Sequence, residues 1–280
     1  MTGASHGMFR RTFKAILILH SIHLRVQIRL ETETDLDYTE AMQYELHFVD
    51  TIDSTNNAVK ALAQAGASEG FVLIADHQTA GRGRLGRSFY SPSGSGLYLS
   101  ILLRPEGAIP PASLTCLTAA AAAETALQFG VDCRIKWVND LYRADRKVAG
   151  ILTEGGLLTD GSYSYAVVGI GFNLCVPPKL PAELRDIVGG LFDEPVIEQQ
   201  RHAFLKSFLS RFAAYYETLP EISFREAYCK RLNVFGRAVS FWHGGVQRTG
   251  IAEAIDPQFR LLVRSGEELV PLERGEVTFL

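Results

Sequence analysis

A glycine- and arginine-rich segment, GRGRLGRSFYS at residues 81–91, separates two apolar runs, FVLIA at 71–75 and LYLSILL at 97–103. Short apolar runs bounded by turn residues are typical of buried strands. The segment is therefore predicted to be a loop held at both ends by a sheet. Glycine lets the backbone approach a ligand, and arginine supplies planar donors for phosphate or carboxylate oxygens. The loop either orders around a phosphate-bearing ligand or lies along nucleic acid.

The overall charge favours a small anionic ligand. The chain has 280 residues, with 28 Lys and Arg against 31 Asp and Glu. A net charge of -3 gives no general positive field to hold a polyanion, so anion recognition must be local. A chain of this length that is 47% hydrophobic can bury a large core, and we expect one large domain and a small one.

Neither the cysteines nor the N-terminal segment indicates export or membrane attachment. The four cysteines lie far apart without a CxxC pair, which argues against a zinc site or a disulfide framework and favours the cytoplasm. Residues 9–30 are basic and then apolar, but polar residues keep the apolar run below the ~18 residues that span a bilayer. We interpret residues 1–41 as a non-catalytic extension, poorly specified or disordered, with the functional protein beginning at Met42.

Periodicity divides the rest of the chain into two parts. Residues 42–231 alternate between strand and helix patterns, with polar turns expected at 139–146 and 158–162. The expected strands are 44–50, 71–75, 97–103, 134–138, 147–155 and 163–173, and the expected helices are 53–65, 111–129, 199–217 and 223–231. Residues 232–280 contain five short strand patterns separated by tight turns, which predict a small barrel.

Three further motifs carry polar side chains in places where a site could form. DSTN at 53–56 begins a helix and offers hydroxyl and amide groups, although the same pattern also serves as a helix cap. KWVNDL at 136–141 ends in an Asn-Asp pair that could hold Mg²⁺ or nucleotide oxygens, or form an ordinary turn. RKVAG at 146–150 places Lys147 at the start of a strand, where it faces either a cavity or the strand edge.

Taken in order, these motifs resemble the biotin protein ligases (biotin--[acetyl-CoA-carboxylase] ligases) over about residues 44–280. The ordered set also includes QTAGRGRLGR followed by SPxGxGLYLS, then GxN at 171–173 and a terminal GEV. Val138 departs from the family's usual proline, and Phe89 replaces a tryptophan found in some members. We expect these changes to loosen one turn and to weaken stacking over adenine. The resemblance implies an α+β fold, with a mixed-sheet catalytic domain of the biotin/lipoate ligase type at 42–231 and a small SH3-like β-barrel at 232–280.

The resemblance also implies an activity. Family members use ATP and Mg²⁺ to convert biotin into biotinyl-5'-AMP and then transfer biotin to a lysine of a biotin carboxyl carrier protein, without a permanently bound cofactor. The residues implied for biotin are Ser54, Thr55, Asn56, Gln78, Arg82, Gly83, Arg84, Lys147 and Gly150. Those implied for the nucleotide are Arg84, Arg87, Phe89, Asn139, Lys147 and Asn173. Arg82, Arg84 and Lys147 are the expected catalytic cations, and Asp140 the expected Mg²⁺ ligand, directly or through water.

Two alternatives remain at this point. One is a lipoate or octanoate ligase-type acyltransferase, which is expected to share the fold but to lack the KWxNDL spacing. The other is a biotin-responsive transcriptional regulator with a DNA-binding helix-turn-helix before the catalytic domain. Residues 1–41 show no such pattern, and residues 31–40 are acidic. We therefore expect no DNA partner and no membrane partner, while a homodimer is in keeping with the family.

Overall fold

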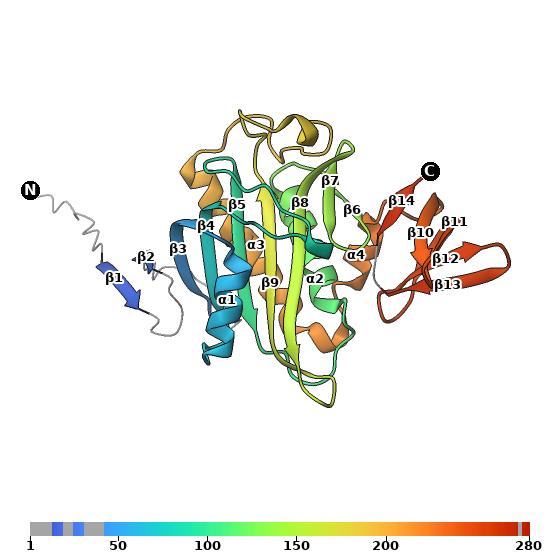
Figure 1. Cartoon of the computed structure of the whole chain (residues 1–280), viewed down its shortest axis with the longest axis horizontal. Helices are drawn as coiled ribbons and strands as arrows, with labels where there is room; N and C mark the ends of the chain where they lie inside the picture. The colour runs from blue at the N-terminus through green and yellow to red at the C-terminus, as the bar shows by residue number, and fades with distance from the viewer. Residues whose placement is uncertain (1–12, 19–24, 31–41, 274–275) are drawn as a thin grey trace, which may run out of the picture.

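The large domain is built on one mixed sheet. The computed structural model describes residues 13–18, 25–30, 42–273 and 276–280. The sheet has nine strands in the order β1-β2-β3-β4-β5-β9-β8-β7-β6 (Figure 1). Strands β3 and β4 are parallel, and the other neighbouring pairs are antiparallel. The strands are β1 (Phe13–Ile18), β2 (Arg25–Leu30), β3 (Glu45–Ile52), β4 (Phe71–Gln78), β5 (Gly96–Leu103), β6 (Arg134–Lys136), β7 (Asp140–Arg143), β8 (Arg146–Leu157) and β9 (Tyr163–Asn173).

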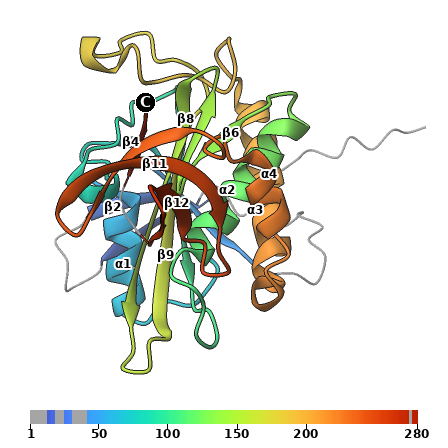
Figure 2. The ribbon, with the colours of Figure 1, turned by 90° about the vertical axis from the view of Figure 1, so that its right-hand side faces the viewer.

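Helices cover both faces of this sheet. Figure 2 shows α1 on one face and α2, α3 and α4 on the other. The helices are α1 (Thr55–Gln64), α2 (Ser113–Gln128), α3 (Glu198–Glu217) and α4 (Arg225–Arg231). Each overlaps a helix predicted from the sequence. Among the residues described, no helix has the length and apolar character required to traverse a bilayer.

The predicted cap of the first helix is confirmed. Ser54 is the N-cap of α1, and its side chain accepts a hydrogen bond from the Asn57 backbone N–H. An N-cap acceptor satisfies a backbone donor that the helix itself leaves unpaired. The helix begins directly after β3, so the residues of its first turn lie at the end of the sheet, where the site forms.

Alanines and phenylalanines fill the core on the face of the sheet that α2 and α3 cover. Ala119–Ala123 of α2 are fully buried, and their small side chains let the helix pack closely against its neighbours. Phe208 of α3 is also fully buried, with its ring centroid 5.2 Å from that of Phe172 on β9. Phe204 and Phe212 of the same helix are buried as well, so these three rings belong to the core.

The prediction of a polar turn at 139–146 is partly wrong. Residues 140–143 form strand β7, which pairs with both β6 and β8. Leu141 is completely buried in this strand, and backbone pairing on both sides joins the strand to the sheet. The turn itself is shorter and contains Ala144 and Asp145, both with positive φ.

The C-terminal residues form the small SH3-like β domain expected from the sequence. Its antiparallel strands follow the order β13-β12-β11-β10-β14. They are β10 (Ala238–His243), β11 (Val246–Ile255), β12 (Leu261–Ser265), β13 (Glu268–Leu272) and β14 (Val277–Phe279). This domain packs on the end of the large one, since Trp137 Nε1 donates to the Phe259 carbonyl at 3.2 Å and the rings of Phe224 and Phe259 stack at 5.3 Å.

The N-terminal segment is described only in part. Strands β1 and β2 pair with each other, and β2 joins the main sheet through the Arg29–Phe48 pair. Residues 1–12, 19–24 and 31–41 of the expected extension lie outside the described residues. The proposed limits of the extension, at residue 41, and of the catalytic domain, near residue 232, stay predictions.

The aromatic core yields a stability prediction. Phe208→Ala would leave a cavity between α3 and the sheet and should lower the free energy of unfolding by about 3–5 kcal/mol. Leu158→Ala serves as the control, because Leu158 is 53% exposed and its loss should cost no more than about 0.5 kcal/mol. Urea denaturation of both variants measures the difference. Equal stability of the two would contradict this packing.

Candidate active site

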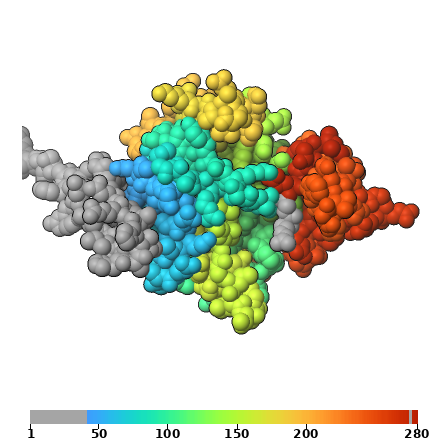
Figure 3. Space-filling model, in the orientation of Figure 1, coloured from blue at the N-terminus to red at the C-terminus, as the bar shows by residue number. Residues whose placement is uncertain are grey.

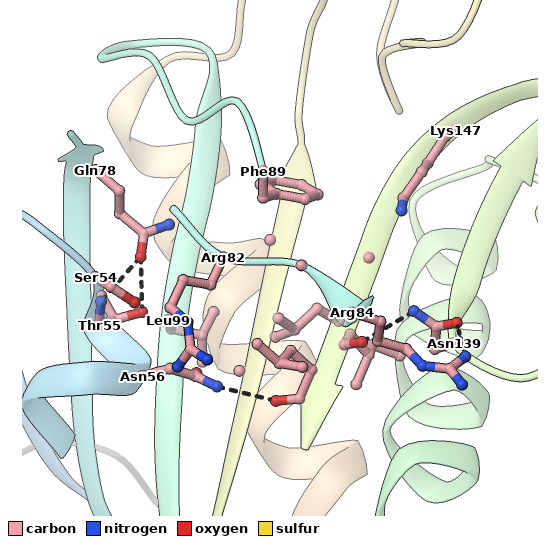
Figure 4. Close-up of a pocket in the computed structure, with 17 residues that line it drawn as sticks. Ser54, Thr55, Asn56, Gln78, Arg82, Arg84, Phe89, Leu99, Asn139 and Lys147 are labelled. Atoms are coloured by element: carbon pink, nitrogen blue, oxygen red, sulfur yellow. Dashed lines mark hydrogen bonds between the residues drawn. The ribbon is translucent and has the colours of Figure 1, made fainter. Parts of the chain in front are cut away.

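A polar pocket opens where α1, the arginine loop and the central strands meet. Its empty space, including the part open to solvent, is about 440 Å³. Figure 4 shows that side chains from these separate segments point toward the same space. The lining residues are Ser54, Thr55, Asn56, Gln78, Arg82, Gly83, Arg84, Phe89, Leu99, Asn139, Lys147, Gly150, Ile151, Leu152, Gly169, Ile170 and Gly171.

Hydrogen-bonding side chains without charge predominate on one side of the pocket, where the Arg82 guanidinium lies beside Asn56 and is paired with Glu154. Gln78 Oε1 accepts from both the backbone N–H and the hydroxyl of Thr55, at 2.9 and 3.1 Å. Asn56 Nδ2 donates to the Leu152 carbonyl at 3.1 Å. Ser54, Thr55 and Asn56 are buried, so these contacts keep the polar groups in fixed positions at the start of α1. This side can bind a polar, uncharged ring.

The opposite side carries positive charge (Figure 4). Arg84 Nη1 donates to Asn139 Oδ1 at 2.7 Å, and Asn139 Nδ2 donates to the Ile151 carbonyl at 3.0 Å. Lys147 Nζ lies 2.8 Å from Asp140 Oδ1. The Phe89 ring lies between the two sides at the mouth of the pocket, with Lys147 Nζ 5.8 Å from its centroid. This side can bind an anion next to an aromatic face.

The arginine loop is a short hairpin whose tip is shaped by backbone bonds. Phe89 N–H donates to the Gly81 carbonyl, and Gly83 N–H donates to the Arg87 carbonyl, at 2.9 and 2.7 Å. At the tip, Leu85 and Gly86 have φ values of 55° and 75°, a region that glycine adopts readily. In Figure 3 the turquoise part of the chain, which contains the loop, extends across the front of the molecule toward the red C-terminal domain.

Glycines on β8 and β9 make room for the pocket's side chains. A Cβ on Gly169 would lie 1.9 Å from Asn56 Oδ1, and one on Gly171 would lie 2.4 Å from Phe89 Cε1. At Gly150 it would come within 2.9 Å of Lys147 Cε and 3.1 Å of the Phe89 ring. The contacts at Gly169 and Gly171 are shorter than those that Cβ atoms make in proteins, and a Cβ at Gly150 would require a small shift of the lysine side chain or the ring. Larger residues on these strands would displace the side chains that face the pocket.

Three of the predicted site residues do not line the pocket. Arg87 forms a two-pronged ion pair with Glu276 of the C-terminal domain, at 2.5 and 2.6 Å. Asn173 is buried, and its side chain donates to the Lys147 carbonyl at 3.1 Å, so it holds the backbone of the lysine in place. Asp140 contacts lining residues through its ion pair with Lys147 and the hydrogen bond that it accepts from Asn139 Nδ2. The roles assigned to these residues stay predictions.

The sequence reasoning missed the floor of the pocket. The missed lining residues are Leu99, Ile151, Leu152, Gly169, Ile170 and Gly171. The alternating glycines in VVGIGFN were a usable signal, because glycine within a strand often marks a close approach. The aliphatic lining residues gave no such signal, because their pattern equally predicts a position in the hydrophobic core.

Glu154 of β8 was also missed, although it joins both α1 and the loop. Its carboxylate accepts from Asn56 Nδ2, Lys60 Nζ and Arg82 Nη1. Burial raises the pKa of Glu154, but the bonds from Lys60, Asn56 and Arg82 outweigh it and hold the pKa below its ordinary value. A lowered pKa in the folded state stabilises the protein above the pKa of the unfolded chain, and this contribution disappears as the pH falls through the folded value.

The site does not provide an obvious protein-built magnesium centre. The residues that the structure describes contain no group of three or more His, Cys, Asp or Glu side chains arranged to hold a metal ion. Asp140 Oδ1 already bonds to Lys147 Nζ and accepts from Asn139 Nδ2. The assignment of Asp140 as a magnesium ligand stays a prediction.

Comparisons with known proteins agree with this geometry. Residues 48–173 match the model of the biotin/lipoate A/B protein ligase family. The chain is 32% identical over 237 residues to the biotin--[acetyl-CoA-carboxylase] ligase of Paracoccus denitrificans, covering 78% of this chain and 95% of that protein. A structure of the Aquifex aeolicus biotin protein ligase with biotin and ATP superposes with a TM-score of 0.71 at 28% identity, covering 84% of this chain and 98% of that one.

A bifunctional ligase/repressor of Bacillus subtilis is 37% identical over 156 residues, which is 55% of this chain. The match spans about half of that relative, 48% of its length. The fold, the sheet and the family model together define a protein of the biotin/lipoate ligase class. Within that class, the chain belongs to the biotin protein ligase family.

The contact between Gly171 and Phe89 yields a prediction about the pocket. Gly171→Ala should lower the free energy of unfolding by about 1–3 kcal/mol, because the new methyl group would overlap the ring. In a Phe89→Ala background the same change should cost much less, and urea denaturation of the four proteins measures this coupling. Gly83→Ala is the control, since its Cβ would lie 3.4 Å from the nearest atom. Additive effects would show that the ring does not occupy this position.

Proposed function

We propose that this protein activates biotin with ATP and transfers it to a lysine of a biotin carboxyl carrier protein. The observation that carries the proposal is the arrangement of the pocket, with hydrogen-bonding side chains and an Arg82 already paired with Glu154 on one side, and the cations Arg84 and Lys147 on the other. Biotin has an uncharged ureido ring at one end and a carboxylate at the other. Thr55, Asn56 and Gln78 suit the ring, and Arg84 and Lys147 suit the carboxylate and the α-phosphate of ATP.

The first step would join two anions, which is unfavourable without neighbouring cations. A biotin carboxylate oxygen attacks the α-phosphorus, the bond to the β-phosphate bridging oxygen breaks, and pyrophosphate leaves. Negative charge grows on the α-phosphate during this step, and donors already aimed at it lower the barrier. Lys147 and Arg84 would act in this way. Mg²⁺ bound to the ATP phosphates would neutralise the departing pyrophosphate.

In the second step the carrier lysine, as a neutral amine, attacks the acyl carbon of biotinyl-5'-AMP. The bond from that carbon to the phosphate oxygen breaks, AMP leaves, and the nitrogen loses a proton to solvent as the amide forms. The intermediate is prone to hydrolysis by water. The arginine loop would close over it and keep water out until the lysine arrives. Phe89 and Asn139 would contact the nucleotide.

Biotin suits the hydrogen-bonding side of the pocket better than lipoate does. The ureido ring offers two N–H donors and one carbonyl acceptor, whereas the dithiolane ring of lipoate has no comparable groups. A buried polar site that loses its hydrogen-bond partners rejects the poorer ligand strongly. Lipoate would offer the side chains of Thr55, Asn56 and Gln78 no hydrogen-bond partners on its ring.

The direct experiment incubates the protein with ATP, Mg²⁺, biotin and a carrier domain and measures the mass of the carrier. The expected result is one added biotinyl group on the carrier, with pyrophosphate released. Lipoate in place of biotin is the control and should give at most a trace of product. Modification by lipoate but not by biotin would refute the proposal.

Lys147 should dominate the first step. Lys147→Ala is expected to slow biotin-dependent pyrophosphate release by about 10²–10³-fold while leaving the protein folded, because a positioned cation is lost. Lys206→Ala removes an exposed lysine of α3 and should leave the rate unchanged. Circular dichroism checks the fold of both variants. Near-normal pyrophosphate release in Lys147→Ala would contradict the role assigned to this residue.

The remaining expectations are part of the same proposal. The four cysteines are free thiols, which suits a cytoplasmic enzyme. Absence of DNA binding and formation of a homodimer stay predictions. Retention on DNA that weakens with added salt would indicate a regulator in addition to a ligase.

A further inference from the structure

Glu154 connects three segments around the pocket through a single carboxylate. Its oxygens accept from Lys60 Nζ at 3.0 Å and from Asn56 Nδ2 at 3.2 Å, both on α1. They also accept from Arg82 Nη1 at 2.8 and 3.0 Å. The carboxylate side chain is only 17% exposed, so it depends on these donors to replace lost water. The carboxylate thus ties the loop to α1 and β8.

The contacts of Arg82 differ from those of the second loop arginine. Arg82 Nη1 also donates to Asn57 Oδ1 at 2.9 Å, which adds a second attachment to α1. Arg84, two residues further on, instead bonds to Asn139 on the cationic side of the pocket. Arg82 and Arg84 therefore point to different ends of the site. One is engaged by a carboxylate, and the other borders the space where the phosphate would bind.

We propose that Glu154 and Arg82 form a clasp that positions the arginine loop before any ligand binds. Glu154 is a positioning residue that acts through Arg82 and Asn56. Arg82 attaches the loop to β8 and α1, whereas Arg84 and Lys147 contact the phosphate directly. Because the same carboxylate holds Asn56, the loop and the ring-binding side are ordered together. The kinetic consequence rests on the proposed function, whereas the ordering of the loop does not.

Hydrogen exchange of the ligand-free full chain tests the clasp itself. Glu154→Gln keeps the size of the side chain but removes its charge, and charged hydrogen bonds stabilise more than neutral ones. Backbone amides in residues 79–91 should exchange about tenfold faster in this variant. Lys60→Gln is the matched control, because it removes another cation from the same carboxylate and leaves Arg82 in place. It should leave exchange in the loop unchanged.

Arg82→Gln breaks the same contact from the other side, so it serves as a second test if Glu154→Gln fails to fold. Unchanged loop exchange in either folded variant would overturn the clasp. Equal acceleration by Lys60→Gln would also overturn it, because the effect would then reflect loss of charge around α1 in general.

Steady-state kinetics of biotin-dependent pyrophosphate exchange test the consequence. Glu154→Gln and Arg82→Gln should each raise the KM for biotin about tenfold with a smaller change in kcat, and the double variant should be no worse than the poorer single one. Independent, multiplying effects would contradict a shared contact. Absence of biotin-dependent pyrophosphate exchange in the unmodified protein would instead refute the proposed function. The hydrogen-exchange result would still show whether the clasp orders the loop.

Discussion

The ion pair between Lys147 and Asp140 is the interaction on which the site depends. Their charged atoms lie 2.8 Å apart, and the two side chains are 24% and 20% exposed. A cation held this way faces the pocket without being surrounded by bulk water. An arriving anion can take the place of Asp140 as its partner, so the cation would already lie beside the phosphate when charge develops there. The positive charge of the arginine loop is likewise confined to one short segment, which suits a small anionic ligand.

The sheet provides the space in which these charges meet. The backbone of Lys147 is held by Asn173 and by bonds to residues 187 and 189, so its side chain starts from a fixed point. Gly150 and Gly171 leave room for the lysine side chain and for Phe89. Strand β7, which carries Asp140, pairs with β8 and brings the carboxylate to the lysine. The central strands thus determine the pocket as much as the polar motifs do.

Much of this arrangement could be predicted from the sequence, because its signals are local. The cap at Ser54, the apolar runs around the loop and the spacing of the α3 aromatics each specify their element directly. Strand β7 could not be predicted in this way, since it depends on pairing with strands on both sides. The motifs named most of the polar lining, but Glu154 carries no local signal, and its importance arises from contacts with residues 72 to 98 positions away.

A structure of the protein with a non-hydrolysable analogue of biotinyl-5'-AMP would test the central claim most directly. The account predicts that Lys147 Nζ leaves Asp140 and lies ~3 Å from an oxygen at the junction of the acyl and phosphate groups. The ureido ring should lie beside Thr55 and Asn56. An analogue bound with Lys147 still paired to Asp140, and with its phosphate away from Arg84, would contradict the account.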